Sequence, residues 1–559
     1  MRFLDKGGAG MIQSEEKKRS ERVFSIILTV LLFAFLALVF YVNLSCNPEY
    51  YDGDIYADIN YAKEAWKAKS LFPQDWVFGN QIYIVATPAL AALFCGLFGN
   101  AFTAMAAASC VMTLLIVLTY DWMMRTLFSY NERTAGFLLL IGALFLKAHL
   151  ATSQQGIQVL FTMASYYACY IITAFVVYGC YIRIRQRKFL KKHILMAVIG
   201  IALSFATGMQ SLRQTTVMAL PIVVCEIALI VFDSVKNKKF FVTKSALFSA
   251  LIFVSNIAGL VAVKFVKLTQ NSIYGATTIV KDPLMFLKRI IYNIEYIALT
   301  FAPDKLRFIP RFTISAVFLS IILIGVIFCV KDNIKGKEKS IDRLVLMILF
   351  ALGCAGVFGA GVLTNIMSRA LYYFMIYPLL AVCASYIIAR TENRRKIFLS
   401  VTAVFAAAMI SFRAVGTIGE IREGKKPDTV SHQIANYMLD NGYDTIYSVF
   451  GLSGRIDGAE NIIVASGDKI HLVQFKRIDR KMAMKPVEYL CVKDDFKSRD
   501  NEKSLYIFRT YELEKAKEIA ARHGVKMTLK AEFGDGIYLY SMSENLCELV
   551  NEYEEKGNG

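Results

Sequence analysis

Three aspartates lie directly after the first long apolar segment, in the run YYDGDIYADINYA, and they are Asp52, Asp54 and Asp58. From Asp54 onward the pattern predicts a helix, on which Asp54 and Asp58 are one turn apart and face the same side. Carboxylates held at a partly dehydrated membrane boundary have pKa values that their surroundings can tune, as a general base requires. The alternative is helix capping by Asp52 or Asp54, because acidic residues favour helix N-termini. Both interpretations can hold at once for different aspartates.

Two arginines lie where other apolar segments end. Arg213 lies in GMQSLRQT, and Arg369 lies in NIMSRALYYF. The guanidinium fork matches phosphate oxygens, so an anionic ligand is one reason for such residues. Ion pairs with the acids or with lipid headgroups are the other.

Aromatic residues are dense near these same segment ends, and Tyr56 and Tyr372 are two of them. An interfacial belt of aromatic residues is expected in any membrane protein, and stacking on a sugar or lining a prenyl groove is the functional alternative. His149, in KAHLATSQQG, lies near a predicted helix end and could contact a substrate, although a lone histidine is more often structural.

The composition indicates a membrane protein. Of the 559 residues, 56% are hydrophobic and only 19% are charged, and the mean hydropathy is +0.46. The net charge of +18 falls in short basic clusters between apolar runs, as is typical of loops that face anionic lipid. These clusters give no support to a nucleic-acid partner.

About eleven apolar runs are long enough to be read as spanning helices of ~20 residues. They are residues 23–45, 100–127, 135–150, 157–182, 194–210, 215–233, 245–266, 312–330, 344–363, 370–389 and 397–415. The apolar segment 82–98 is short and contains Pro88, so we expect it to dip into the interface without crossing. With that topology the basic clusters share one side, which is then cytoplasmic.

This orientation predicts a domain plan. Residues 1–22 form a cytoplasmic tail, and residues 23–415 form the membrane domain, with outer loops 46–99 and 267–311. Residues 416–559 form an extracytoplasmic α/β domain, and the protein is expected to lie in the plasma membrane. Its predicted elements include a helix ending at Gly442, a strand in YDTIYSVF, a helix over 511–524 and a hairpin around residues 534–536. Both arginines fall on the outer side.

Metal and redox motifs are absent from the sequence. No CxxC pair occurs among the eleven cysteines, and the histidines are scattered. Cys491 and Cys547 fall in the soluble domain and could pair.

The sequence resembles the membrane-embedded glycosyltransferases of the GT-C fold, including the protein O-mannosyltransferase and aminoarabinose transferase group. The first likeness is YYDGDIYADINYA, which fits the D-x-x-Y-A and D-x-x-x-[DE] forms of an acidic motif after the first helix. The second is TPALAALFCGLFGNAFTAMAAAS, where a proline-containing apolar dip and a Phe-Gly pair precede a long helix. The third is SRALYYFMIYP, an arginine with aromatic residues before a proline. Asp52-Gly53-Asp54 stands where many members have Asp-Glu, so the identity of the base is open, and bacterial membrane proteins built in this way are an equally good match.

The resemblance implies a transferase that takes a sugar from a polyprenyl phosphate. Asp54 or Asp52 would then deprotonate an acceptor on a glycan, lipid or protein. Asp58, Arg213, Arg369, Tyr372, Tyr56 and His149 would contact the substrates. No cofactor is required, and the need for a divalent cation is left open.

Two other classes of function fit parts of the pattern. A transporter, flippase or polymerase of polysaccharide lipids would place ionisable groups near the bilayer midplane, where this chain has few beyond Glu226 and Lys147. A non-enzymatic assembly or sensor protein would depend on the outer domain instead.

Overall fold

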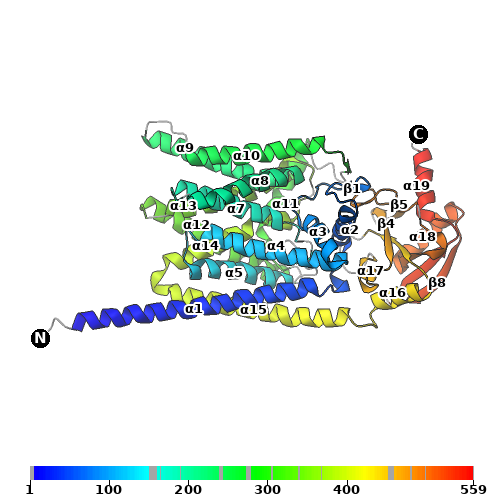
Figure 1. The fold of residues 1–559 in the computed structure, drawn as a ribbon, viewed down its shortest axis with the longest axis horizontal. Helices are drawn as coiled ribbons and strands as arrows, with labels where there is room; N and C mark the ends of the chain where they lie inside the picture. The colour runs from blue at the N-terminus through cyan, green and yellow to red at the C-terminus, as the bar shows by residue number, and fades with distance from the viewer. Residues whose placement is uncertain are drawn as a thin grey trace.

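The computed structural model describes residues 5–149, 160–163, 165–188, 190–237, 243–271, 278–303, 306–337, 340–366, 368–450, 459–478, 481–497, 499–534 and 536–557. A helical bundle carries a smaller α/β domain at one end, and the N-terminus lies at the other end (Figure 1). The bundle helices are α1 (Asp5–Leu44), α4 (Ala101–Met124), α5 (Tyr130–His149), α7 (Ala168–Arg185), α8 (Ile194–Gln210), α9 (Leu220–Asn237), α10 (Lys244–Ala262), α11 (Pro283–Ala298), α12 (Phe308–Ile334), α13 (Ser340–Leu363), α14 (Ile376–Arg390) and α15 (Arg395–Gly424).

The protein is a multi-pass helical membrane protein. Within the described residues, eight helices are long and apolar enough to cross a membrane, and α8 and α14 are apolar but shorter. Helix α5, also predicted as a span, begins with a charged turn that contains Glu132 and Arg133. Each of the eleven predicted spans therefore corresponds to a helix, although not all reach full spanning length.

One predicted span has the wrong start. The apolar run 157–182 was expected to be a single helix, but α7 begins only at Ala168. Met163 and Ser165 have φ angles of 55° and 46°, in the left-handed region, so the chain turns there instead of continuing as a helix. A hydropathy pattern does not reveal this turn, because the residues of the turn are as apolar as those of the helix.

The predicted outer loop 46–99 is folded. It contains η1 (Pro48–Tyr50), α2 (Gly53–Lys67), β1 (Trp76–Phe78) and α3 (Thr87–Phe98). Helices α2 and α3 lie at the bundle end that faces the α/β domain, and α2 runs across the bundle direction (Figure 1). The proline-containing segment 82–98 therefore does not run through the bundle.

A small sheet joins the three parts of the chain that are predicted to lie outside. Strand β1 pairs in parallel with β2 (Thr269–Gln270), which follows α10, and antiparallel with β6 (Cys491–Val492) of the C-terminal domain. Because each pairing is between segments far apart in the sequence, the sheet fixes the α/β domain to the loop that carries the aspartates.

The C-terminal domain is built on a six-stranded sheet with the order β5-β4-β3-β7-β9-β8, of which β4, β3 and β7 are parallel. The strands are β3 (Thr445–Val449), β4 (His471–Ile478), β5 (Lys481–Pro486), β7 (Ser504–Arg509), β8 (Met527–Phe533) and β9 (Ile537–Met542). The helices are α16 (Val430–Asp440), α17 (Glu460–Ala465), α18 (Thr510–Arg522) and α19 (Leu546–Gly557). The two helices, the strand and the hairpin expected from the sequence are all confirmed.

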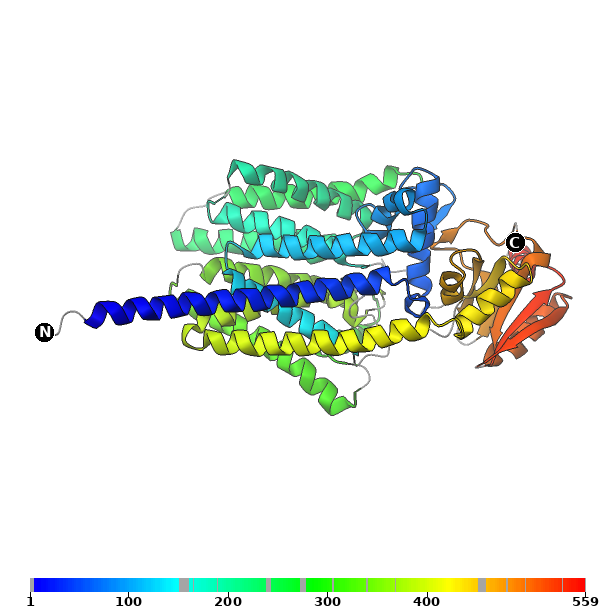
Figure 2. The ribbon, with the colours of Figure 1, turned by 60° about the horizontal axis from the view of Figure 1, so that its bottom comes forward.

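Two helices extend past the expected domain boundaries, which stay predictions, and the suggested cysteine pair is not formed. Helix α1 begins at Asp5, inside the expected tail 1–22, and α15 continues to Gly424, past the expected boundary at 415. Figure 2 shows both helices running the length of the bundle. Cys491 and Cys547 are both free, because Cys491 lies on β6 while Cys547 is buried in α19.

Glycines allow two helices beside the site to approach closely. A Cβ on Gly208 of α8 would collide with the backbone of Asn256, and a Cβ on Gly259 of α10 would collide with the backbone of Phe205. Small residues at such crossings are typical of helix packing in membranes. The close contact fixes the end of α8, where Gln210 and Arg213 follow.

Candidate functional site

The three aspartates form one group, the carboxylate cluster of Asp52, Asp54 and Asp58, at the start of α2. The Oδ1 atom of Asp52 accepts a hydrogen bond from the backbone N–H of Ile55 at 3.0 Å, so Asp52 is the N-cap of the helix. The capping interpretation is therefore confirmed for Asp52. The side chain of Asp54 makes no cap hydrogen bond of this kind, which leaves its carboxylate available for other work.

Burial raises the pKa of every carboxyl group in the cluster. For Asp52 the pKa rises to about 7, first through burial and then through the charge of Asp54. Burial also raises the pKa of Asp54, although the positive charge of Arg369 opposes it. Asp58 is only 3% exposed, and burial raises its pKa well above the usual range. Acids whose pKa lies near neutrality can exchange protons at physiological pH.

Tyr83 positions the deepest carboxyl of the cluster. Its hydroxyl donates a hydrogen bond to Asp58. The backbone N–H groups of Ile84 and Val85 donate to the side-chain oxygen of Gln210 at 3.2 and 3.3 Å. Gln210, at the end of α8, thus anchors the segment that carries Tyr83.

Tyr166 is a site residue that the sequence reading missed. Its pKa is raised by burial and further by the charges of all three carboxylates, which places its ring beside the cluster. Its hydroxyl oxygen is buried and has no hydrogen-bond partner among the residues that the structure describes. A buried polar group without a partner is uncommon in a protein and often marks a place where a substrate binds. The only signal in the sequence was a Tyr-Tyr pair inside an apolar run.

Contacts from two spanning helices hold the turn that precedes Tyr166. Asn43 of α1 donates to the carbonyl of Phe161 at 3.0 Å and accepts from the N–H of Met163 at 2.8 Å. Thr113 of α4 donates to the same carbonyl of Phe161 at 3.0 Å. The turn is therefore held between the end of α1 and the middle of α4.

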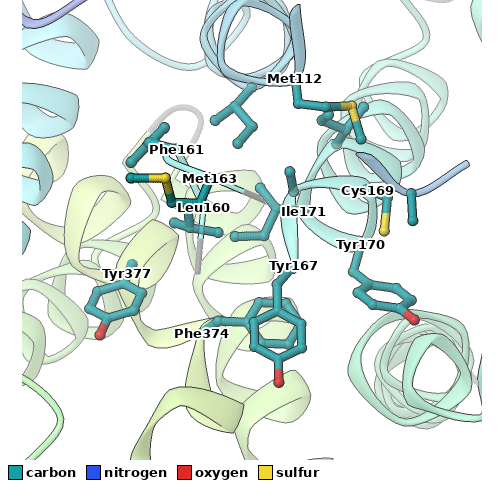
Figure 3. Close-up of a cluster of buried hydrophobic side chains, with 14 of the residues drawn as sticks. Met112, Leu160, Phe161, Met163, Tyr167, Cys169, Tyr170, Ile171, Phe374 and Tyr377 are labelled. Atoms are coloured by element: carbon teal, nitrogen blue, oxygen red, sulfur yellow. The ribbon is translucent and has the colours of Figure 1, made fainter. Parts of the chain in front are cut away.

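Arg213 lies in a cage of aromatic rings. Its guanidinium carbon is 4.5 Å from the ring centre of Tyr167, 5.6 Å from Tyr170 and 5.4 Å from Tyr372. Tyr167 is stacked on Phe374 at 4.8 Å, as Figure 3 shows. In the part of the chain that the structure describes, the guanidinium has no carboxylate partner. Its charge is supported by ring faces alone, so its hydrogen-bond donors are left for an anion.

Arg369 lies between this cage and the carboxylate cluster. It is the N-cap residue of η5 (Ala370–Tyr373), which Tyr373 fixes to α11 by donating a 2.6 Å hydrogen bond to Asn293. Its positive charge lowers the pKa of Asp54 and that of Tyr167, against the larger effect of burial in both cases. The described residues show no ion pair or side-chain hydrogen bond of Arg369.

The structure thus brings together most of the predicted site residues. Asp54 faces Arg369, and Arg369 and Arg213 both lie close to Tyr167. The roles of these residues in catalysis and binding stay predictions.

Two predicted residues are not brought to this group. Tyr56 is 1% exposed and its hydroxyl accepts a hydrogen bond from the backbone of Leu472 in β4, so it faces the C-terminal domain. His149 is the last residue of α5, and its side chain lies outside the described part of the chain.

Within the described residues, no group of three His, Cys, Asp or Glu side chains is arranged to hold a metal ion. The divalent-cation question therefore stays open.

Glu226, the main acid inside the bundle, is fully engaged by its neighbours. Its carboxylate accepts hydrogen bonds from Tyr181, from Thr243 at 2.6 Å and from Ser245 at 2.8 Å, and Arg185 lies 4.0 Å away. Lys147 donates to the carbonyl of Thr300 at 2.8 Å. Satisfied groups of this kind indicate structural roles.

The fold and the position of these residues define the chain as a GT-C-like helical membrane protein with an appended α/β domain. Among solved structures it is similar to ArnT from Cupriavidus metallidurans bound to undecaprenyl phosphate, with a TM-score of 0.51 and 12% identity over 92% of this chain and 98% of that chain. The apo structure of the same ArnT gives the same TM-score and identity over 93% and 98%. No family model matches the sequence, and no curated protein does either. At this identity the likeness shows the fold, which agrees with the resemblance drawn from the sequence motifs.

Proposed function

We propose that the protein is a glycosyltransferase of the plasma membrane, which transfers a sugar from a polyprenyl-phosphate carrier to a cell-envelope acceptor. One observation carries the proposal: at one end of the bundle, Asp54 faces Arg369, and neither Arg369 nor the caged Arg213 has an ion-pair partner of its own in the described residues. The ArnT structure of the same fold was solved with undecaprenyl phosphate bound, and this makes a lipid phosphate the best candidate for the missing anion.

The proposed orientation follows from charge. The basic loops lie at the bundle end that holds the N-terminus, and the α/β domain lies at the other end. Because positive loops stay inside, the N-terminus is cytoplasmic and the carboxylate cluster faces outward. Nucleotide sugars are not available there, so a sugar donor has to be delivered on a lipid.

The chemistry is a direct displacement at the anomeric carbon. Asp54 as carboxylate accepts the proton of the acceptor hydroxyl or amine while the acceptor atom forms its bond to the anomeric carbon. The bond from that carbon to the phosphate oxygen breaks, and polyprenyl phosphate leaves with one more negative charge. Arg369 and Arg213 stabilise this developing charge through their free N–H donors.

Asp52 and Asp58 support the base without replacing it. Asp52 uses one oxygen to cap α2, and Asp58 is bonded to Tyr83 and buried. The charge of Asp54 raises the pKa of Asp52, and the charges of both raise the pKa of Asp58, so these two neighbours hold their protons more readily than ordinary carboxyl groups do.

The transporter alternative has less support, because the principal intramembrane acid, Glu226, is bonded to three hydroxyl groups and the available cations lie at the outer end. An assembly or sensor role would require the outer residues to be dispensable for any transfer.

The test is transfer by the purified full-length protein in nanodiscs, supplied with radiolabelled polyprenyl-phosphate hexoses and pentoses together with envelope extracts as acceptors. We expect label to move to an acceptor fraction with release of polyprenyl phosphate. The same reaction with a chelator added decides the divalent-cation question. If no donor in the panel is consumed and undecaprenyl phosphate does not bind, the proposal is wrong.

A further inference from the structure

A second polar site lies at the opposite end of the bundle, far from the carboxylate cluster. It is a cavity of about 590 Å³ between the end of α12, the start of α13, and the end of α14 with η6 (Glu392–Arg394). Helix α15 runs from this end to the α/β domain, so the two sites are separated by the length of the bundle (Figure 2).

The charged residues that line the cavity are unbalanced. They are Lys337, Arg343, Arg390 and Arg394 against Asp332 and Glu392, which is four cations against two carboxylates and leaves an excess of two positive charges. Asp332 forms ion pairs with two of these cations, with Arg390 at 2.8 Å and with Lys337 at 3.0 Å.

The arginine at the start of α13 is held in a fixed position. Arg343 donates from Nε and Nη2 to the carbonyl of Leu127 at 3.1 and 2.8 Å, and it packs over the rings of Phe128 and Tyr386 at 4.9 and 5.7 Å. Tyr386 in turn donates to Asp332 at 2.6 Å. A carbonyl and ring faces hold this guanidinium, and it forms no ion pair within the described residues.

The last cation has no partner. In the described residues Arg394 forms no ion pair or side-chain hydrogen bond, although Glu392 lines the same cavity. Two guanidiniums that form no ion pair within the described residues, Arg343 held in place and Arg394 exposed, suit the binding of phosphate oxygens.

We infer that this cavity binds a phosphate group at the membrane boundary. Two sources share that chemistry, the headgroup of an anionic phospholipid and a free phosphate. The proposed orientation puts the cavity at the inner leaflet, where anionic headgroups gather. Binding itself depends neither on this orientation nor on sugar transfer.

The test measures lipid retention by native mass spectrometry. Full-length protein is released from nanodiscs of phosphatidylcholine with and without phosphatidylglycerol, and the phosphatidylglycerol that stays bound is counted. Arg394→Gln should weaken retention about tenfold, as loss of one charge-assisted contact implies. Arg394 is exposed and without a partner, so this variant should fold normally. The double variant Arg343→Gln/Arg394→Gln should abolish retention.

The matched control is Lys331→Gln/Lys335→Gln, which removes two charges from the end of α12 without touching the cavity lining. It should retain the lipid as the unchanged protein does. A second experiment adds inorganic phosphate. If the bound lipid is not displaced, the site binds a lipid headgroup. If phosphate raises the melting temperature and Arg394→Gln removes this effect, the site binds free phosphate. If neither probe distinguishes Arg394→Gln from the control, the inference is wrong.

Discussion

At the scale of single residues, the raised proton affinity of the carboxylate cluster has a measurable consequence. A carboxyl with a pKa of about 7, as at Asp52, is mostly protonated below that pH and cannot accept a proton.

The rate of transfer should fall as the pH drops, since burial raises the pKa of Asp54 and the base is protonated at a higher pH than an ordinary carboxyl group. Arg369→Gln removes the positive charge that opposes this rise in the pKa of Asp54, so the acid limb of the profile should move to higher pH. The measurement is kcat/KM between pH 5 and 9. An acid limb that does not move would show that the cluster does not contain the base.

Tyr166 offers a contrast between function and stability. Its hydroxyl has no partner, so Tyr166→Phe should leave the melting temperature unchanged or slightly raised while it slows transfer several-fold. Tyr61 is the matched control, because its hydroxyl donates to the carbonyls of Leu71 and Tyr83 at 2.9 and 3.1 Å. Tyr61→Phe should lower the melting temperature. Equal losses of stability in both variants would contradict a substrate-facing role for Tyr166.

The charged residues of the site were the easiest part to predict from the sequence. The aspartates and both arginines were visible because acids after a span and arginines on the outer side are unusual. Tyr166, Tyr83 and Gln210 were not visible, since each belongs to a run whose hydropathy predicts nothing beyond burial. Tyr56 was misplaced because the helical pattern gives its side of α2 but not which domain covers that side.

At the scale of elements, the site depends on a segment that hydrogen bonds attach to the end of a bundle helix. Gln210 accepts both N–H groups of Ile84 and Val85, so it fixes the stretch that carries Tyr83 to the end of α8. A buried N–H left without its acceptor costs about 1–3 kcal/mol.

Gln210→Leu should therefore raise hydrogen exchange at residues 82–85 and reduce transfer, since Tyr83 no longer supports Asp58. Gln214→Leu is the control: Gln214 is also buried, but it only donates a 3.5 Å bond to the carbonyl of Tyr170. Both variants are compared by exchange mass spectrometry and by rate. Unchanged exchange at 82–85 in Gln210→Leu would show that other contacts hold this stretch.

Element prediction succeeded where periodicity was strong and failed where a turn was apolar. The helices and the hairpin of the α/β domain follow from turn residues such as Gly442 and Gly536, both of which have positive φ. The turn before α7 has no glycine or proline, and it is held by Asn43 and Thr113 from other helices. Tertiary contacts of that kind leave no local sequence signal.

At the scale of the whole molecule, the account requires the two bundle ends to face different compartments. The three-stranded sheet of β1, β2 and β6 ties the α/β domain to the end with the carboxylate cluster, so both lie on one side of the membrane. Sequence predicted this arrangement through charge, whereas the sheet itself joins strands of two or three residues that no pattern marks.

Fusions at the C-terminus test the orientation in cells. Alkaline phosphatase fused after the last residue should be active, because it folds only outside the cytoplasm, while green fluorescent protein at the same place should be dark. The reverse pair of results would show the opposite membrane orientation, with the carboxylate cluster on the cytoplasmic side.

The most direct test of the central claim separates binding from chemistry in one nanodisc preparation. Undecaprenyl phosphate binding and transfer of labelled sugar are measured for Asp54→Asn and Arg369→Gln. The controls are Glu64→Gln near the end of α2, where Glu64 pairs with Lys67, and Arg307→Gln at the start of α12. Asp54→Asn should bind the lipid normally yet lose transfer by about 10²-fold or more, as loss of a general base implies. Arg369→Gln should lose lipid affinity by about tenfold or more, as loss of a charged hydrogen bond implies. Both controls should behave as the unchanged protein. If Asp54→Asn transfers sugar at the normal rate, the carboxylate that faces Arg369 is not the base and the proposed mechanism is wrong.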